Sequence, residues 1–318
     1  MKQISIVIVN YNGKDLLKTL LKSISESTYK NYEIIVVDNN SNDNSQDFIK
    51  KNYKNVKLIA NKRNLGYSGI NSGLRYCTGD YILFLNNDIE IDKNCISSML
   101  KVIKSDKNTA MTAPKLVNYY NKNLKSNGTW VSRAFYCGHI KGNHEKTVKE
   151  IPYLGVGLIK KEVVDQYDYL FDPDYFIYAE DFDLGLRIRL LGMKVLFVPN
   201  AIMYHMHSAT MQKSSSARNT FLLERNLLIT FFKNIELRNI ILFMPYVLFG
   251  RFTAIIKDIL SFQLRTAISR IKAIFWILFN LKLIIKKRNE TQKLRKVNDN
   301  YLFEIFSEKY LFKKKFIV

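Results

Sequence analysis

Residues 81–92, YILFLNNDIEID, begin as an apolar strand and end in polar side chains. The first five residues have the pattern of a buried strand, and Asn86, Asn87 and Asp88 follow directly. Amide and carboxylate side chains are typical of a turn, because they satisfy the backbone there. The same oxygens are also suitable ligands for a divalent cation. Taken alone, the stretch leaves a turn and a metal site as alternatives.

The first ninety residues alternate apolar runs with helical patterns, which predicts an α/β fold. The expected strands are residues 4–12, 32–40, 56–62 and 81–88, and the expected helices are residues 14–27, 43–51 and 66–76. Continuous apolar strands are typical of a parallel sheet covered on both faces, and ligands bind such sheets at the carboxyl ends of the strands. All four strands end in polar residues, so a ligand site becomes the favoured interpretation of residues 86–88.

Beyond residue 93 the regular alternation ends. We expect a helix over residues 94–105, a strand over 111–117, and irregular or hairpin structure over 126–140. The polar segment KSSSARN predicts a boundary near residue 215, which gives a globular domain over 1–215 and a helical, apolar and basic region over 216–318. The three widely spaced cysteines fit neither a disulfide framework nor a zinc site, which indicates a reducing compartment.

Positive charge is concentrated in the last third of the chain. The full sequence has 49 Lys and Arg against 28 Asp and Glu, and residues 211–318 hold 21 of the former and 7 of the latter. Such an excess indicates nucleic acid or an anionic membrane surface as a partner. Here the basic residues interrupt apolar helical runs, which favours a membrane. The runs 240–250 and 271–281 are short for a bilayer span, so we expect helices lying in the membrane interface. The alternative is that these helices pack on the catalytic domain or on a second subunit.

Two positions at the strand ends are candidates for nucleotide binding. Asp38 ends the second strand, where a carboxylate can bond to a base or ribose, although a lone Asp is equally typical of a turn. Arg63 lies in the glycine-containing run NKRNLGYSGINSGL, residues 61–74, and can pair with a diphosphate. Neither G-x-G-x-x-G nor G-x-x-x-x-G-K-[ST] occurs, which argues against a dehydrogenase and a P-loop enzyme.

Acidic residues and histidines form two further candidate groups. Glu180, Asp181 and Asp183 open a helical segment. Acids in a first turn are favoured by the helix dipole, so the alternatives are simple capping and a general base at the edge of the sheet. His205 and His207 lie on one face of an extended strand, which would allow metal ligation.

These segments resemble the family 2 glycosyltransferases, particularly the rhamnosyltransferase-like branch that builds surface polysaccharides. The resemblance covers about residues 4–234 and implies a GT-A fold, which has a nucleotide-sugar half and an acceptor half. The matching segments, in family order, are SIVIVNYNG, VVDNNSND, NKRNLGYSGINSGL, YILFLNNDIEID, YLGVGLIKKEVV, FDPDYFIYAEDFDLGLRIRLLG, YHMHSAT and LLERNLLITFFKN.

The resemblance also implies roles for individual residues. Asp88 would bind the divalent cation, Mn²⁺ or Mg²⁺, that bridges the sugar diphosphate, and Asp181 would be the catalytic base. The familiar metal triplet is Asp-x-Asp, whereas this chain has Asn at position 86. The remaining implied residues are Tyr11, Asp38, Arg63, Asn64 and Asn86 for the donor, His205 or His207 for the metal, and Glu180, Asp183 and Arg187 on the acceptor side or in support.

The implied reaction inverts the anomeric carbon, because one base acts without an enzyme nucleophile. The implied partners are a nucleotide sugar (dTDP-rhamnose or a UDP-sugar), a lipid-linked or cell-surface glycan acceptor and an anionic membrane surface, but no nucleic acid. The expected location is the cytoplasmic face of the cell membrane. The alternatives are an inactive GT-A scaffold at the membrane and a nucleotidyltransferase, for which NYNGKDLL supplies no phosphate-binding glycine loop. No pattern indicates an oligomeric state.

Overall fold

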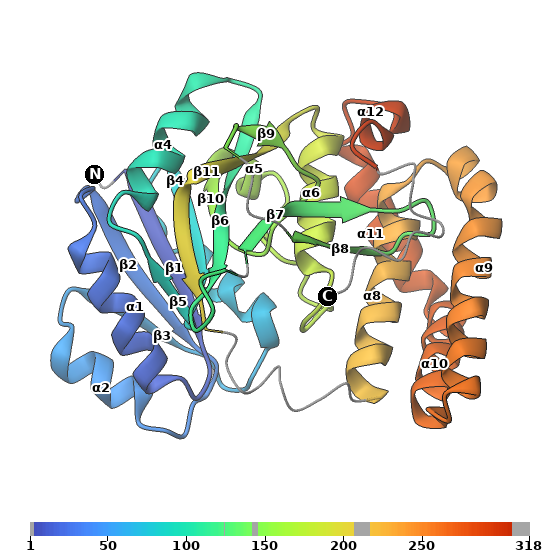
Figure 1. Cartoon of the computed structure of the whole chain (residues 1–318), viewed down its shortest axis with the longest axis horizontal. Helices are drawn as coiled ribbons and strands as arrows, with labels where there is room; N and C mark the ends of the chain where they lie inside the picture. The colour runs from blue at the N-terminus through green and yellow to red at the C-terminus, as the bar shows by residue number, and fades with distance from the viewer. Residues whose placement is uncertain (1–2, 124, 142–145, 207–216, 307–318) are drawn as a thin grey trace.

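The computed structural model describes residues 3–123, 125–141, 146–206 and 217–306. Figure 1 shows a twisted sheet flanked by helices, with a separate group of helices packed beside it. The predicted alternation of the first half is confirmed, except that the third helix is a 3₁₀ segment followed by a short α-helix. Its elements are β1 (Ile4–Asn10), α1 (Lys14–Glu26), β2 (Tyr32–Asp38), α2 (Ser45–Asn52), β3 (Val56–Ala60), η1 (Gly66–Ile70), α3 (Asn71–Leu74) and β4 (Tyr81–Asn86).

The first four strands are parallel and lie in the order β3-β2-β1-β4. The chain therefore begins at a central strand, β1, adds β2 and β3 toward one edge of the sheet, and then places β4 on the other side of β1. Open α/β sheets bind ligands where the strand order reverses in this way, which here is between β1 and β4. Asn10, Asp38 and Asn86 are the last residues of β1, β2 and β4.

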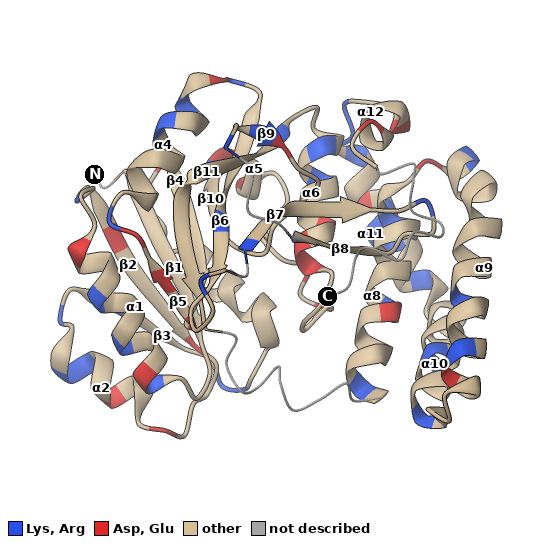
Figure 2. Ribbon diagram, viewed as in Figure 1, with Lys and Arg blue, Asp and Glu red and all other residues tan. Residues whose placement is uncertain are grey.

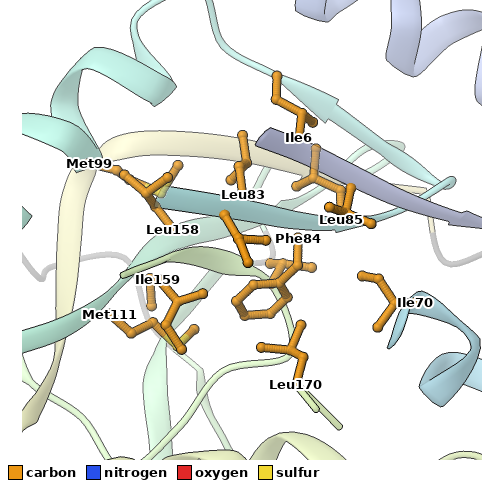
Figure 3. Packing of buried hydrophobic residues seen from close by; sticks show 14 of the residues in the cluster. Ile6, Ile70, Leu83, Phe84, Leu85, Met99, Met111, Leu158, Ile159 and Leu170 are labelled. Atoms are coloured by element: carbon orange, nitrogen blue, oxygen red, sulfur yellow. The ribbon is translucent and has the colours of Figure 1, made fainter. Parts of the chain in front are cut away.

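The apolar runs that predict these strands form the main hydrophobic core. Every residue of β1 is buried, and so are the four central residues of β4. Figure 3 shows Leu83 and Phe84 pointing to opposite sides of β4, as successive residues of a strand do. Phe84 meets Phe171 edge to face, with ring centroids 5.6 Å apart. Each fully buried side chain of this size contributes roughly 1.5–3 kcal/mol.

The second half turns the sheet into a mixed one. Strand β10 is antiparallel to both β4 and β6, and β5 is antiparallel to β11. Residues 126–140, expected as irregular or hairpin structure, lie in the antiparallel hairpin of β7 and β8. The elements are β5 (Ile89–Ile91), α4 (Cys95–Ser105), β6 (Thr109–Asn118), β7 (Lys125–Val131), β8 (Cys137–Lys141), β9 (Lys149–Glu150), β10 (Gly157–Lys160), α5 (Lys161–Asp165), α6 (Glu180–Leu190) and β11 (Lys194–His205).

The C-terminal region is helical, as its sequence predicts. It shares a second hydrophobic core with α6 and the loop of the β7–β8 hairpin, in which Phe135, Phe182 and Phe231 are fully buried neighbours. The boundary expected near residue 215 falls in residues 207–216, outside the described residues. The helices are α8 (Ala217–Asn234), α9 (Leu237–Leu260), α10 (Leu264–Phe279), α11 (Leu281–Lys293) and α12 (Asp299–Phe303).

A buried ion network also joins the two regions. Lys233 of α8 is fully buried and lies 2.8 Å from both Asp172 and Asp183, while Lys287 of α11 lies 2.6 Å from Asp172. Burial alone would lower the pKa of Lys233, but its attraction to the two carboxylates outweighs burial and raises that pKa well above its ordinary value. The cations from the C-terminal helices therefore balance acids of the sheet region.

Replacing Lys233 with Met is expected to lower the free energy of unfolding by about 3–5 kcal/mol, because it removes one partner of a buried ion pair. Chemical denaturation followed by circular dichroism measures the change. Lys286→Met is the matched control on α11, since Lys286 is exposed and lies 3.9 Å from Glu290. That control should change the free energy by less than about 1 kcal/mol. Equal losses in both variants would contradict a stabilising role for the network.

Candidate active site

The carboxylate of Asp38 organises the strand ends. It is fully buried and accepts hydrogen bonds from Asn10 Nδ2 at 2.9 Å, from Gln46 Nε2 at 2.7 Å, and from the hydroxyl and amide of Ser41 at 2.6 and 2.9 Å. Asn10 Oδ1 in turn accepts from Asn87 Nδ2 at 2.7 Å. These hydrogen bonds connect the ends of β1, β2 and β4. Asp38 therefore fixes the positions of the strand ends at this edge of the sheet.

Tyr11 and Arg63 have exposed side chains at the same edge, Tyr11 just beyond β1 and Arg63 just beyond β3. Asn64 instead faces its own loop, where its Oδ1 accepts from the amide of Gly66 at 2.8 Å. Asn39, which sequence reasoning missed as a site residue, donates from Nδ2 to the carbonyl of Gly66 at 2.7 Å. The two exposed side chains are open to a ligand, whereas the two amides shape the glycine-containing loop.

Asp88 and His205 lie together, although they are distant in sequence. Residues 89–91 pair with the end of β11, with Ile89 opposite His205, and this register brings the Asp88 carboxylate to the imidazole. Asp88 Oδ2 lies 3.2 Å from His205 Nε2, and Asp88 is only 6% exposed. His207 lies outside the described residues.

The Asp88–His205 pair fits a divalent cation by its chemistry. A carboxylate oxygen and an imidazole nitrogen are both suitable ligands for Mn²⁺, and Mg²⁺ commonly has one or two protein carboxylates with phosphates and water. Asn86, the last residue of β4, is half-buried. Within the described residues there is no cluster of three or more His, Cys, Asp or Glu side chains that could enclose a metal. A bound diphosphate and water are suited to supply further ligands.

Glu180 and Asp181 begin α6 with different environments. Glu180 is buried, whereas Asp181 is partly exposed and accepts a hydrogen bond from the amide of Phe182 at 2.8 Å. Burial raises the pKa of Asp181 to about 6. Burial and the neighbouring Asp181 charge together raise the pKa of Glu180 well above its ordinary value. Burial and the neighbouring charge thus favour the neutral form of Glu180, whereas Asp181, with a pKa of about 6, is ionised at neutral pH and suited to accept a proton.

Tyr67 lies between the acidic groups. The charges of Glu180, Asp181 and Asp88, after burial itself, contribute to raising its pKa well above the ordinary value. Its hydroxyl donates to the carbonyl of Gly155. A Cβ at Gly155 would lie 3.3 Å from Asp181 Oδ2, so a glycine keeps the space beside this carboxylate open. Tyr67 was missed as a site residue, although it lies within the quoted run 61–74.

Asp183 and Arg187 face the interior of the protein. Both are at most 1% exposed, and Arg187 Nε lies 2.9 Å from Asp183 Oδ2. Asp183 also belongs to the buried network with Lys233. Their contacts lie on the buried side of α6 and stabilise the helix. They do not bring either side chain to the open side of Asp181.

Known proteins with similar sequences are glycosyltransferases. The sequence profile described as Glycosyl transferase family 2 matches residues 5–167, which is just over half of the chain. The amylovoran biosynthesis glycosyltransferase AmsB of Erwinia amylovora is 28% identical over 220 residues, covering 65% of this chain and 71% of that protein. The UDP-Glc:alpha-D-GlcNAc-diphosphoundecaprenol beta-1,3-glucosyltransferase WfaP of Escherichia coli is 36% identical over 110 residues, covering 34% of this chain and 43% of WfaP.

The fold is also that of solved glycosyltransferases. A crystal structure of GalNAc-T7 with UDP, GalNAc and Mn²⁺ superposes with a TM-score of 0.59 at 20% identity, covering 72% of this chain and 47% of that chain. This similarity confirms the predicted GT-A fold. Together with the sequence profile over residues 5–167, it leads to one assignment: the chain is a glycosyltransferase that belongs to glycosyl transferase family 2.

Proposed function

We propose that this chain is an inverting, metal-dependent enzyme that transfers a sugar from a nucleotide diphosphate to a hydroxyl of a lipid-linked or cell-surface glycan. The observation that carries the proposal is the partly exposed Asp181 carboxylate, whose pKa is raised to about 6 by burial. The charges of Asp181 and Asp88 both act on Tyr67, which supports assigning the proposed base and the proposed metal ligand to one site.

The reaction needs one proton acceptor. The acceptor oxygen attacks the anomeric carbon while the bond from that carbon to the diphosphate breaks, and the nucleoside diphosphate leaves with the electron pair. Asp181 takes the proton of the acceptor hydroxyl. Attack from the side opposite the leaving group inverts the anomeric centre, through an oxocarbenium-like transition state. The raised pKa of Glu180, caused by burial and the adjacent charge, disfavours a second negative charge beside the base.

Asp88 and His205 would hold the divalent cation, and Tyr11, Asp38, Arg63, Asn64 and Asn86 would form the donor side. When bound, such a cation neutralises charge on the departing diphosphate without protonating it. Arg63 is exposed and can pair with the same diphosphate. Asp38, already fully bonded, would act by shaping the wall against which the nucleoside lies.

The donor is proposed to be a UDP-sugar or dTDP-rhamnose, and the acceptor a diphospholipid-linked glycan. The WfaP name, which states a UDP-glucose donor and a diphosphoundecaprenol acceptor, supports this class. The test is to incubate the chain with Mn²⁺, a panel of nucleotide sugars and a synthetic lipid diphosphosaccharide, and to detect products by mass spectrometry. Transfer from one donor supports the proposal. Nucleotide binding without transfer from any donor would instead favour an inactive scaffold.

The proposal places the enzyme on an anionic membrane, at the cytoplasmic face of the cell membrane, through α9 and α10. One side of these helices carries exposed apolar residues at helical spacing, whereas Val247, Arg251 and Ala273 on the other side are buried. In the ribbon of Figure 2, α9 and α10 are mostly tan, the colour of uncharged residues, with blue positions of Lys and Arg between them. The exposed apolar residues include Ile241, Leu248, Phe252, Ile259, Ile271 and Phe275.

The excess of basic residues on α9 and α10 supports an anionic lipid surface as the partner. Lys257, Arg265 and Lys272 are exposed on these helices, and Asp258 is the one acid in residues 237–285, where it is buried and lies 2.8 Å from Arg270. By length and composition, α9 is the one described helix suited to cross a membrane. Its ion-paired Asp258, facing neighbouring helices, favours the interfacial position over a span.

Replacing Lys257, Arg265 and Lys272 with Glu together is expected to weaken binding to anionic vesicles about 100-fold or more, because each basic residue contributes roughly 1 kcal/mol near such a surface. Co-sedimentation with phosphatidylglycerol vesicles measures the change. Glu substitutions at Lys18, Lys50 and Lys51, all exposed on α1 and α2, form the charge-matched control and should retain binding. Equal weakening in both triple variants, or no binding by the wild type, would contradict this docking surface.

A further inference from the structure

The segment that leads into α6 has an unusual backbone. Phe176, Tyr178 and Ala179 have φ values of 60°, 73° and 61°, in the left-handed region that residues other than glycine rarely adopt. Ala179 directly precedes the first turn of α6. The conformation of residues 175–179 therefore sets the direction in which that turn presents its acidic side chains.

One buried side chain of α8 holds this loop. Asn226 is fully buried, and its Nδ2 lies within hydrogen-bond distance of the carbonyls of Tyr175 at 3.0 Å, Ile177 at 3.0 Å and Tyr178 at 2.7 Å. Its Oδ1 accepts two hydrogen bonds from the guanidinium of Arg225, at 3.0 and 2.8 Å. The guanidinium fixes the orientation of the amide, so the donor group of Asn226 must face the loop.

The other side of the loop is held by the glycine-containing run. The amide of Tyr67 donates to the carbonyl of Phe176 at 2.7 Å, and a Cβ at Gly66 would lie only 2.0 Å from that same oxygen. Tyr67 also lies among the acidic groups of the site. Residues 175–179 are thus held between α8 on one side and the glycine-containing run 61–74, which borders the active site, on the other.

We infer that Asn226 is a positioning residue, which holds residues 175–179 in their left-handed course so that Asp181 is aimed at the acceptor hydroxyl. The inference rests on the proposed role of Asp181 as the base. Asn226 itself touches backbone carbonyls of the loop and does not touch the reacting groups. A buried amide that only filled space would not need its donor group directed to three carbonyls of one strained segment.

The test is Asn226→Asp, which preserves size and still accepts from Arg225 but places an oxygen against the loop carbonyls. Amide hydrogen exchange in residues 176–183 should become about tenfold faster or more in the chain without ligands. In the transfer assay kcat should fall about 10–100-fold, while KM for the nucleotide sugar stays within about twofold, because misplacement of a base affects the chemical step.

Ser269→Ala is the control for simple loss of a buried hydrogen bond in the helical region, since Ser269 is buried on α10 and its hydroxyl donates to the carbonyl of Arg265 at 3.0 Å. It should lower stability without faster exchange in the loop. Arg225→Gln is the second test, and its effects should be smaller because Asn226 remains. It should also speed exchange in residues 176–183 and lower kcat. Unchanged exchange in residues 176–183 for both Asn226→Asp and Arg225→Gln would overturn the inference. Failure of the wild type to transfer sugar would overturn the proposed function but leave the exchange test valid.

Discussion

With Asp181 replaced by Asn, the rate of sugar transfer is expected to fall about 10²–10⁴-fold, the usual contribution of a positioned general base. The amide has almost the same shape as the carboxylate but cannot take the proton of the acceptor hydroxyl. Donor binding should therefore survive, because the donor side is formed by other residues. Initial rates at saturating nucleotide sugar, together with calorimetric titration of the nucleoside diphosphate, separate the two effects.

The pH dependence gives an independent readout of the same residue. Since burial raises the pKa of Asp181 to about 6, wild-type kcat/KM should rise with pH up to about 6 and then level off. This limb should disappear in Asp181→Asn. The raised pKa also means that ionisation of Asp181 lowers stability as the pH rises from 3.8 to about 6, and that this cost stays constant above 6, so the substitution should not lower the melting temperature at pH 7.

Glu180→Gln is the matched control for Asp181→Asn. Burial and the adjacent charge raise the pKa of Glu180 and favour its neutral form, which a neutral amide resembles. Its rate should fall by less than about tenfold, well below the contribution of a general base. If Glu180→Gln is the more damaging change, or if the pH limb survives without Asp181, then another group is the base.

Asp88→Asn is expected to have the second largest effect, a loss of about 10²–10³-fold in transfer, because neutralising a departing diphosphate is worth several kcal/mol. The substitution removes the carboxylate that lies 3.2 Å from His205 and leaves an amide, a weaker ligand for a divalent cation. Titration of Mn²⁺ in the presence of the nucleoside diphosphate should show weakened binding. That calorimetric readout does not depend on turnover.

Asp92→Asn serves as the control, since Asp92 lies in the same stretch but caps a turn by accepting from the amide of Asn94 at 2.9 Å. It should preserve both Mn²⁺ binding and transfer. Unchanged turnover in Asp88→Asn, with the dependence on Mn²⁺ intact, would remove the metal role from this residue.

The first half of the fold is predictable because its signals are local. Strands β1, β2 and β4 are largely apolar runs, which are typical of a parallel sheet covered on both faces, whereas the edge strand β3 carries Lys57 and is partly exposed. The polar residues that end these strands, such as Asn10 and Asp38, can also be recognised in the sequence, because they interrupt an apolar run. Parallel strands bring their carboxyl ends to one edge, so the approximate position of the site also follows.

The rest of the site depends on contacts between distant segments. The Asp88–His205 pair exists because β5 pairs with the end of β11 in one register, which no local pattern encodes. The environment of Asp181 likewise depends on burial by neighbouring elements. Asn226 lies in an apolar and basic helix that resembles a surface helix, and its partners in residues 175–178 precede it by about fifty residues. Side-chain orientation in such cases is a tertiary property.

The ion network of Asp172, Asp183, Lys233 and Lys287 has a consequence for how this enzyme can be rearranged. A catalytic region cut from its helices, by a protease or in a chimera with a relative's C-terminus, would leave Asp172 without either of its lysines and Asp183 with Arg187 alone. Uncompensated carboxylates inside a protein are strongly destabilising. The C-terminal helices therefore cannot be exchanged freely between relatives. A chimera would be stable only where the buried acids of its catalytic region are matched by lysines of its helices.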